Sequence, residues 1–268
     1  MHLLNNDLPL SISLEQSTYL NAEGFAKAGF EAVECDLPVH YREKADLSIF
    51  EPFLKCFYPY VRGAGLRIAA YHLPFGVSWD ISSPDEDVRA SAVQATATVI
   101  RMLEPYEGTN VVLHPSFEPI GEDEREAHIA ACQKSLMELG PVAAQAGKWI
   151  ALENLPRTCL GRTSQEMERL TQNGTLCSIC MDTTHMFHET PQQFMQRLGP
   201  FIVNTHLSDY LNGQNECHWV PGTGSLNWRE ILENLIALHY AGTYNFEMSK
   251  YEPLEILGGL TNALKNRC

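Results

Sequence analysis

The chain has 268 residues, of which 44% are hydrophobic, and its formal charge at pH 7 is −14. A chain of this length can bury a substantial core and suits one α/β barrel better than two independent units, so we expect a single domain over residues 1–268. The acidic balance disfavours a nucleic-acid partner, because contacts with phosphate groups depend on Lys and Arg.

The sequence contains no recognisable membrane or export signal. No apolar stretch approaches the roughly 20 residues that a membrane span needs. The N-terminal residues MHLLNNDLPL lack the charged, apolar and small-residue sections of a signal peptide. We therefore expect a cytoplasmic protein without a membrane partner.

The eight cysteines are scattered, and most lie in apolar helix or strand patterns, where a free thiol behaves as a small hydrophobic residue. Cys177 and Cys180 form a CxxC pair, but both fall in a predicted strand, where positions i and i+3 face opposite sides. No second CxxC follows to complete a zinc site. We predict reduced cysteines with a packing role.

Strand-like and helix-like segments alternate along the whole chain without a linker or a block of like charges, which is typical of a parallel sheet built from βαβ units. The strand-like runs are continuously apolar, as expected of strands that are buried on both faces. We predict eight units, with strands near residues 8–13, 31–36, 67–72, 109–114, 149–154, 177–182, 201–206 and 243–248.

The clearest helix follows the third strand. Ser83 is expected to be its N-cap, Pro84 occupies the first turn, and the acidic residues 85–87 complement the helix dipole. This helix should run to about Glu104. A second long helix is predicted within residues 122–147, with a break at Gly140–Pro141. Other helices are expected near residues 17–28, 48–63, 163–172, 190–198, 227–239 and 252–265.

Several predicted strands end in residues that can bind a metal ion. Side chains delivered singly from successive strand ends are how a (β/α)8 barrel builds a metal site at its C-terminal face. The 41 residues that separate the last two such strand ends include a Gly- and Asn-rich loop, and loops on that face usually set substrate specificity. The strand-end residues are His72, His114, Glu153, Asp182, His185, His206, Asp209 and Glu247.

Four of these residues form a ligand set of one nitrogen and three carboxylates. Such a set suits Mn²⁺, Mg²⁺ or Co²⁺ and tolerates Zn²⁺. A divalent ion would also neutralise carboxylates that otherwise force at least one of their number to protonate. A single strand-end carboxylate often caps a helix or pairs with an arginine, but four in register favour one divalent metal ion and an enzyme. The four are Glu153, Asp182, His206 and Glu247.

At these positions the chain resembles the xylose isomerase-like TIM-barrel superfamily, which includes sugar isomerases, ketose 3-epimerases, inosose-type dehydratases and endonuclease IV. The motifs ALEN, MDTTH, THLSD, HWVPGTGSLNW and NFEM follow the order of the family's strand ends, and the likeness covers nearly the whole chain, with good motif support from about His72 onward. The resemblance implies a (β/α)8 TIM barrel of eight parallel strands. It also implies that the four residues bind the metal, with Glu153 and Glu247 acting as the acid/base pair on opposite sides of a carbohydrate.

The resemblance favours a divalent-metal-dependent sugar or sugar-phosphate isomerase or epimerase. A metal bound to the carbonyl and adjacent hydroxyl of a keto sugar stabilises the enediolate, while a carboxylate on each face removes or returns a proton. His185 would hydrogen-bond a substrate oxygen. Whether the protein forms a homo-oligomer is left open. Other substrate contacts would come from His72, His114, Arg157 and His218, with a surface ion pair as the alternative for Arg157.

Three alternatives remain open, and one narrower assignment is disfavoured. Asn212 stands where ketose 3-epimerases of the tagatose type carry an arginine, which argues against a free-ketohexose 3-epimerase. A lyase of the inosose or dehydroshikimate dehydratase type would use the same metal-stabilised enolate, and a carbohydrate-binding protein without activity would keep the site but not the chemistry.

The third alternative is a three-zinc phosphodiesterase similar to endonuclease IV. Its zinc ions would activate water and stabilise the charge of the phosphate. Glu216 stands where that family has aspartate, and the long loop lacks the arginines expected to hold a DNA backbone. The chain nevertheless offers a candidate for each of the nine ligands, in the order His72, His114, Glu153, Asp182, His185, His206, Glu216, His218 and Glu247.

Overall fold

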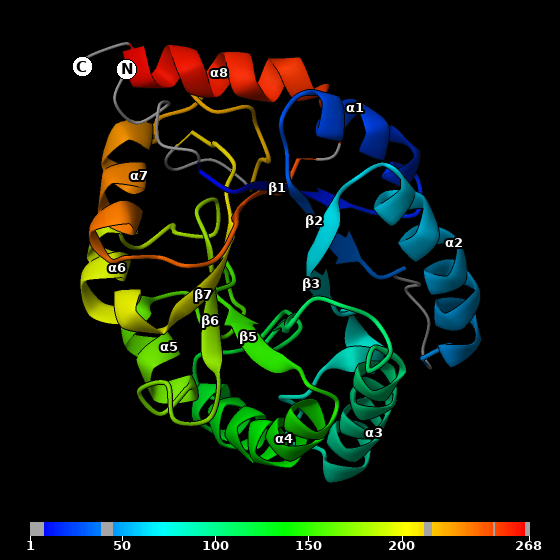
Figure 1. The fold of residues 1–268 in the computed structure, drawn as a ribbon. Coiled ribbons are helices and arrows are strands. Elements are labelled where there is room, and N and C mark those ends of the chain that lie inside the picture. The colour runs from blue at the N-terminus through cyan, green and yellow to red at the C-terminus, as the bar shows by residue number, and fades with distance from the viewer. Residues whose placement is uncertain (1–7, 39–44, 212–215, 249, 266–268) are drawn as a thin grey trace.

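A computed structural model describes residues 8–38, 45–211, 216–248 and 250–265 (Figure 1). Eight parallel strands within these ranges form one sheet in which β1 to β7 pair in chain order and β8 pairs with β1. A parallel bridge between Leu207 and Phe246 joins the end of β7 to β8 and closes the barrel. The strands are β1 (Leu10–Leu14), β2 (Ala32–Asp36), β3 (Arg67–His72), β4 (Asn110–Leu113), β5 (Trp149–Glu153), β6 (Ser178–Asp182), β7 (Ile202–His206) and β8 (Tyr244–Phe246).

Helices surround the strands and complete the (β/α)8 TIM barrel that the sequence predicts (Figure 1). Short 3-10 segments lie at Tyr19–Asn21, Leu47–Ile49, Val77–Trp79 and Gly199–Phe201. In the described part of the chain, no helix is long and apolar enough to span a membrane. The α-helices are α1 (Ala22–Lys27), α2 (Phe50–Gly63), α3 (Glu86–Met102), α4 (Arg125–Gln145), α5 (Ser164–Leu170), α6 (Pro191–Leu198), α7 (Trp228–Ala237) and α8 (Pro253–Lys265).

The two long helices differ from their predictions. The N-cap of α3 is Asp85 and not Ser83, because the Asp85 carboxylate accepts hydrogen bonds from the amides of Asp87 and Val88. The helix ends at Met102, two residues before the predicted end.

The predicted break at Gly140–Pro141 is absent, and α4 continues through Pro141. A proline inside a helix removes one backbone hydrogen bond. The helix nevertheless persists, because Leu136, Leu139 and Ala143 on either side of the proline are buried in the core.

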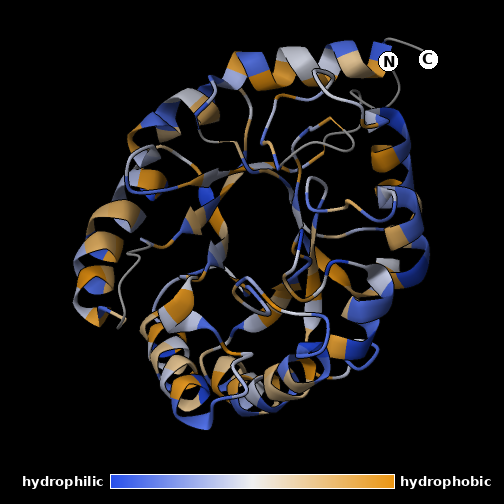
Figure 2. Ribbon diagram, turned by 180° about the vertical axis from the view of Figure 1, so that it is seen from behind, coloured by the Kyte–Doolittle hydropathy of each residue, from blue (hydrophilic) through white to orange (hydrophobic). Residues whose placement is uncertain are grey.

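The apolar core lies between the strands and the ring of helices. Figure 2 shows that hydrophobic and hydrophilic residues occupy different sides of the helices. Fully buried aromatic side chains such as Phe25, Phe57 and Trp228 fill this layer. Cys177 and Cys180 are also buried and form no disulfide, in agreement with the sequence.

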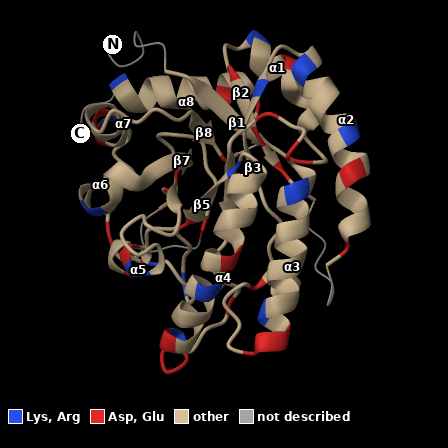
Figure 3. Ribbon diagram, turned by 60° about the horizontal axis from the view of Figure 1, so that its bottom comes forward, with Lys and Arg blue, Asp and Glu red and all other residues tan. Residues whose placement is uncertain are grey.

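Ion pairs join neighbouring helices outside the core. Helices α3 and α4 lie side by side, with charged residues along their outer surfaces (Figure 3). Arg89 of α3 contacts Glu138 of α4 at 2.9 Å. Arg125 of α4 contacts Glu166 of α5 at 2.6 Å, and both side chains of this second pair are nearly buried.

The inside of the barrel is partly polar. Small apolar residues, Val112, Ala151 and Cys180, fill one side of it. Buried hydrogen-bonding side chains occupy the β1, β2, β7 and β8 side, and on the last three strands they lie two residues before Asp36, His206 and Glu247. We call these residues the polar column, which comprises Ser11, Ser13, Glu34, Asn204 and Asn245.

Candidate metal centre

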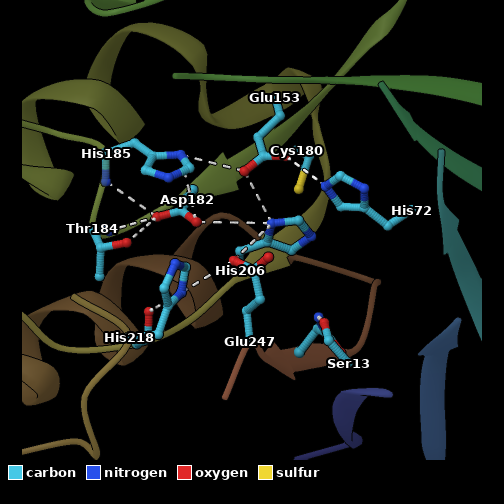
Figure 4. Close-up of polar contacts among 12 residues, drawn as sticks. Ser13, His72, Glu153, Cys180, Asp182, Thr184, His185, His206, His218 and Glu247 are labelled. Atoms are coloured by element: carbon cyan, nitrogen blue, oxygen red, sulfur yellow. Dashed lines mark hydrogen bonds and ion pairs between the residues drawn. The ribbon is translucent and has the colours of Figure 1, made fainter. Parts of the chain in front are cut away.

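The ends of β3 to β8 and the loops that follow them bring carboxylates and imidazoles together at the C-terminal end of the barrel (Figure 4). One group contains the four residues predicted as metal ligands, whose ligand atoms lie within 4.8 Å of one another. Nδ1 of His206 lies 3.1 Å from Glu153 Oε1, 3.4 Å from Glu247 Oε2 and 3.8 Å from Asp182 Oδ2. We call Glu153, Asp182, His206 and Glu247 the central group.

Two carboxylate oxygens of the central group fit the bonding needs of a metal ion. Asp182 Oδ2 and Glu247 Oε2 are buried and accept no hydrogen bond from the described residues, although imidazole nitrogens lie 3.4 to 3.8 Å away. A buried carboxylate oxygen without a donor is costly unless a cation or another donor completes its environment. One nitrogen and three carboxylates with such free lone pairs suit a divalent ion.

The local sequence DTTH explains why one oxygen of Asp182 stays free. After β6 the chain turns so that the amides of Thr184 and His185 and the Thr184 hydroxyl all donate to Asp182 Oδ1, at 2.6, 3.2 and 2.9 Å. These three bonds fix the carboxylate plane. They leave Oδ2 directed at the imidazoles of His185 and His206.

A second group consists of His72, His114 and Glu153. Glu153 Oε2 lies 3.2 Å from His72 Nε2 and 3.3 Å from His114 Nε2. Because the Leu73 carbonyl can only accept, Nδ1 of His72 must donate to it, at 2.9 Å. Nε2 faces Glu153 Oε2, which also only accepts, so the metal-free ring can donate from both nitrogens; loss of the Nε2 proton would free that lone pair for a metal ion.

A third group consists of His185, Glu216 and His218. Glu216 Oε1 lies 3.3 Å from Nε2 of both histidines. The Asn154 carbonyl accepts a hydrogen bond from His185 Nδ1 at 2.9 Å. This bond holds Nε2 of His185 toward Glu216, just as the Leu73 carbonyl holds Nε2 of His72 toward Glu153. The nine candidates named for a three-zinc site therefore all lie together.

Arg157 lines a cavity beside the central group, and its guanidinium forms ion pairs with Glu118 and Glu216. Its guanidinium donates to Glu118 Oε1 at 2.5 and 2.8 Å and to Glu216 Oε2 at 2.6 Å. The alternative of an ion pair is therefore the one that the structure shows. Through this pair Arg157 holds Glu216 with its other oxygen toward His185 and His218.

Asp209, which belongs to the strand-end series in the sequence, is a structural anchor and joins none of the metal-binding groups in the described residues. It is fully buried. Its Oδ1 accepts from the amides of Tyr210 and Leu226, and its Oδ2 accepts from the Gly222 amide and the Trp228 indole. Asp209 therefore ties together both ends of the loop that carries Glu216 and His218. Asn212 of this loop lies outside the described residues.

Sequence reasoning missed two acidic residues of β2. Glu34 Oε1 lies 2.7 Å from His206 Nε2, on the side of the ring opposite the central group. Asp36 lies at the strand end, and its Oδ1 is buried without a hydrogen bond. A charged residue inside an apolar strand was the available signal, since the segment EAVECD places Glu34 among buried positions.

The two carboxylates predicted as the acid/base pair ionise differently. Burial, reinforced by the nearby charges of Asp182 and Glu153, raises the pKa of Glu247 to about 7, although His206 and His218 oppose this shift. Burial also acts to raise the pKa of Glu153. The charges of His206 and His114 and hydrogen bonds from histidines outweigh it and hold that pKa well below the usual value.

Two of the cavities that adjoin the central group contain His72. The larger, of about 540 Å³, is lined by residues that include Glu15, Asp36, His72, Phe75 and Glu247. The smaller, of about 210 Å³, lies on the side of His114, Glu216 and His218 and also contains His72 and Glu247. A small molecule in either cavity can reach the central group.

Comparisons with known proteins agree with this architecture. A sequence model of the family described as "Xylose isomerase-like TIM barrel" matches residues 23–265. An uncharacterized protein of Methanocaldococcus jannaschii is 28% identical over 185 residues, which are 66% of this chain and 62% of that protein. The chain thus matches less than two thirds of the length of this curated relative.

Solved structures with the same fold include several sugar epimerases. A D-tagatose 3-epimerase-like protein superimposes with a TM-score of 0.75 at 20% identity, over 94% of this chain and 97% of the other. The E. coli 3-keto-D-glucoside 4-epimerase gives 0.72 at 17% identity, over 95% and 98%. IolI with a bound zinc atom gives 0.73 at 14% identity, over 94% and 97%. At these identities the likeness establishes the fold.

Proposed function

The chain belongs to the xylose isomerase-like TIM-barrel family, and on this premise we propose that it is a divalent-metal-dependent sugar or sugar-phosphate isomerase or epimerase. The observation that carries the proposal is the central group, in which Asp182 Oδ2 and Glu247 Oε2 keep free lone pairs beside His206 Nδ1. Sugar epimerases among the similar structures support the same class of substrate.

The four residues of the central group would hold the metal. A divalent ion there would polarise a carbonyl and stabilise the negative charge of an enediolate. Glu153 would be ionised and able to take a proton from the carbon next to the carbonyl. Glu247 would be the second carboxylate of the acid/base pair and would give or take the other proton.

Hydrogen exchange provides the test of this reaction. The protein should be incubated in D₂O with Mn²⁺ or Mg²⁺ and a panel of ketoses, both free and phosphorylated, and deuterium next to the carbonyl should be followed by NMR. Glu247→Gln should slow exchange by about 10²- to 10⁴-fold, the usual contribution of a general acid or base. Absence of exchange across the panel would count against the proposal, and a dehydrated product would identify the lyase alternative.

A second candidate, a three-zinc phosphodiesterase, is favoured by one specific observation. The groups His72, His114, Glu153 and His185, Glu216, His218 flank the central group and could each hold another ion. Elemental analysis of protein loaded with Zn²⁺ should then give about three ions per chain, and DNA containing an abasic site should be cut. Binding of a single ion would exclude this candidate.

A further inference from the structure

The two ring nitrogens of His206 face different surroundings. Nδ1 points to Glu153, Asp182 and Glu247 of the central group (Figure 4). Nε2 lies 2.7 Å from Oε1 of Glu34, which is 1% exposed. A carboxylate only accepts hydrogen bonds, so Nε2 must be the donor in this contact. Nδ1 lies 3.1 Å from Glu153 Oε1, which is also a carboxylate oxygen, so Nδ1 can donate as well while no metal is bound; when a metal ion binds Nδ1, the remaining ring proton is the one on Nε2.

We propose that Glu34 is a positioning residue that keeps the proton of His206 on Nε2 and so presents Nδ1 to the divalent ion. The inference rests on the proposed metal dependence. Histidine ligands of metals commonly donate their other ring N–H to a carboxylate, which fixes the ring and raises its basicity as a ligand. Glu34 lies inside the barrel, one layer below the strand-end residues, and would act only through His206.

The polar column holds Glu34 in place. Asn204 Nδ2 donates to Glu34 Oε2 at 2.7 Å, and the Ser13 hydroxyl lies 3.4 Å from Oε1. Ser13 in turn accepts a hydrogen bond from Asn245 Nδ2 at 2.8 Å. Because these contacts come from three other strands, the carboxylate cannot swing away without breaking several bonds. A surface salt bridge lacks this rigidity.

The substitution Glu34→Gln would reverse the direction of the hydrogen bond to His206 Nε2 while keeping the shape of the side chain. Glutamine offers one acceptor oxygen, and Asn204 already donates to that end of the side chain. With its oxygen toward Asn204, the Gln NH₂ group would donate to His206 Nε2. The ring would then carry its proton on Nδ1, where it blocks the metal. We expect Zn²⁺ affinity, measured against a competing chelator, to fall about 10- to 100-fold.

A second variant tests the direction of the hydrogen bonds. In Glu34→Gln/Asn204→Asp, the new aspartate accepts from the Gln NH₂ group and turns the Gln oxygen toward His206. Most of the lost Zn²⁺ affinity should return. Glu166→Gln is the matched control, because it also neutralises a buried carboxylate but lies in the Arg125 pair, outside the metal-binding groups. This control should leave Zn²⁺ affinity unchanged.

A spectroscopic measurement separates positioning from general support of the fold. In ¹⁵N-histidine-labelled protein loaded with Zn²⁺, the Nε2–H proton of His206 should resonate far downfield in the wild type and move upfield in Glu34→Gln. Unchanged affinity and an unchanged resonance in Glu34→Gln would overturn the inference. Neither readout needs a substrate, so a protein that binds Zn²⁺ through this arrangement but exchanges no sugar proton would refute only the proposed reaction.

Discussion

Buried charges meet in two places in this protein, and the two differ in how completely their hydrogen bonds are satisfied. Arg125 places Nε and Nη2 at 2.6 Å from the two oxygens of Glu166, and its remaining donors reach the carbonyls of Thr158 and Cys159. In the central group, Asp182 Oδ2 and Glu247 Oε2 accept no hydrogen bond from any residue that the structure describes. The first arrangement is complete in the protein alone, whereas the second leaves two carboxylate oxygens open to a ligand.

The largest effect on stability is expected at the Arg125–Glu166 ion pair. Arg125→Met would leave the Glu166 carboxylate buried without its cation, and we expect the free energy of unfolding to fall by about 3–5 kcal/mol. Chemical denaturation gives this value, while Zn²⁺ affinity of the folded protein should stay at the wild-type level. Arg125→Met/Glu166→Met should recover part of the loss, since no lone charge remains. If the single substitution is neutral, the pair is not a structural element.

The second-largest effect on stability is expected in the central group. Asp182→Asn keeps an oxygen for the donors of Thr184 and His185 but replaces the free oxygen by an NH₂ group. Without metal, we expect the free energy of unfolding of the Asp182→Asn variant to stay within about 1 kcal/mol of the wild type, because the three hydrogen bonds persist. Mn²⁺ at a hundred times its Kd should stabilise the wild type by about 2.7 kcal/mol.

Asp182→Asn should lose most of this stabilisation by Mn²⁺, and thermal melting with and without the ion measures the loss. An equal response of both proteins to Mn²⁺ would remove Asp182 from the set of ligands.

The smallest effect is expected at the surface, where solvent screens charges. Hydrogen bonds from Arg89 and Lys134 lower the pKa of Glu86 from 4.5 to about 2. Because the folded pKa lies below the usual value, this carboxylate stabilises the protein above pH 4.5 and loses that contribution as the pH falls toward 2. The Tm difference between wild type and Glu86→Gln should thus be small at pH 6 and shrink on acidification. Glu51→Gln, which removes a carboxylate with a single lysine partner, should give a smaller difference at pH 6.

The sequence allowed the strands and the central group to be predicted, because both depend on local pattern. Each apolar run that ends in a ligand residue lies within two residues of an observed strand, and parallel strands of a barrel bring their ends to one face. The contacts whose partners could not be predicted depend on how distant residues meet in the folded chain. The Arg157 contact with Glu118 and Glu216 joins residues 39 and 59 positions apart, and Glu34 meets His206 across 172 positions.

Asp209 also bears on how this protein could be redesigned. Its carboxylate binds the chain at Tyr210, Gly222, Leu226 and Trp228 and so clamps the loop where it leaves the barrel and where it returns. The segment between Tyr210 and Gly222 can therefore be exchanged as a cassette, with Asp209, Gly222 and Trp228 left in place. A library restricted to that segment would vary the surroundings of the central group while the barrel keeps its own hydrogen bonds.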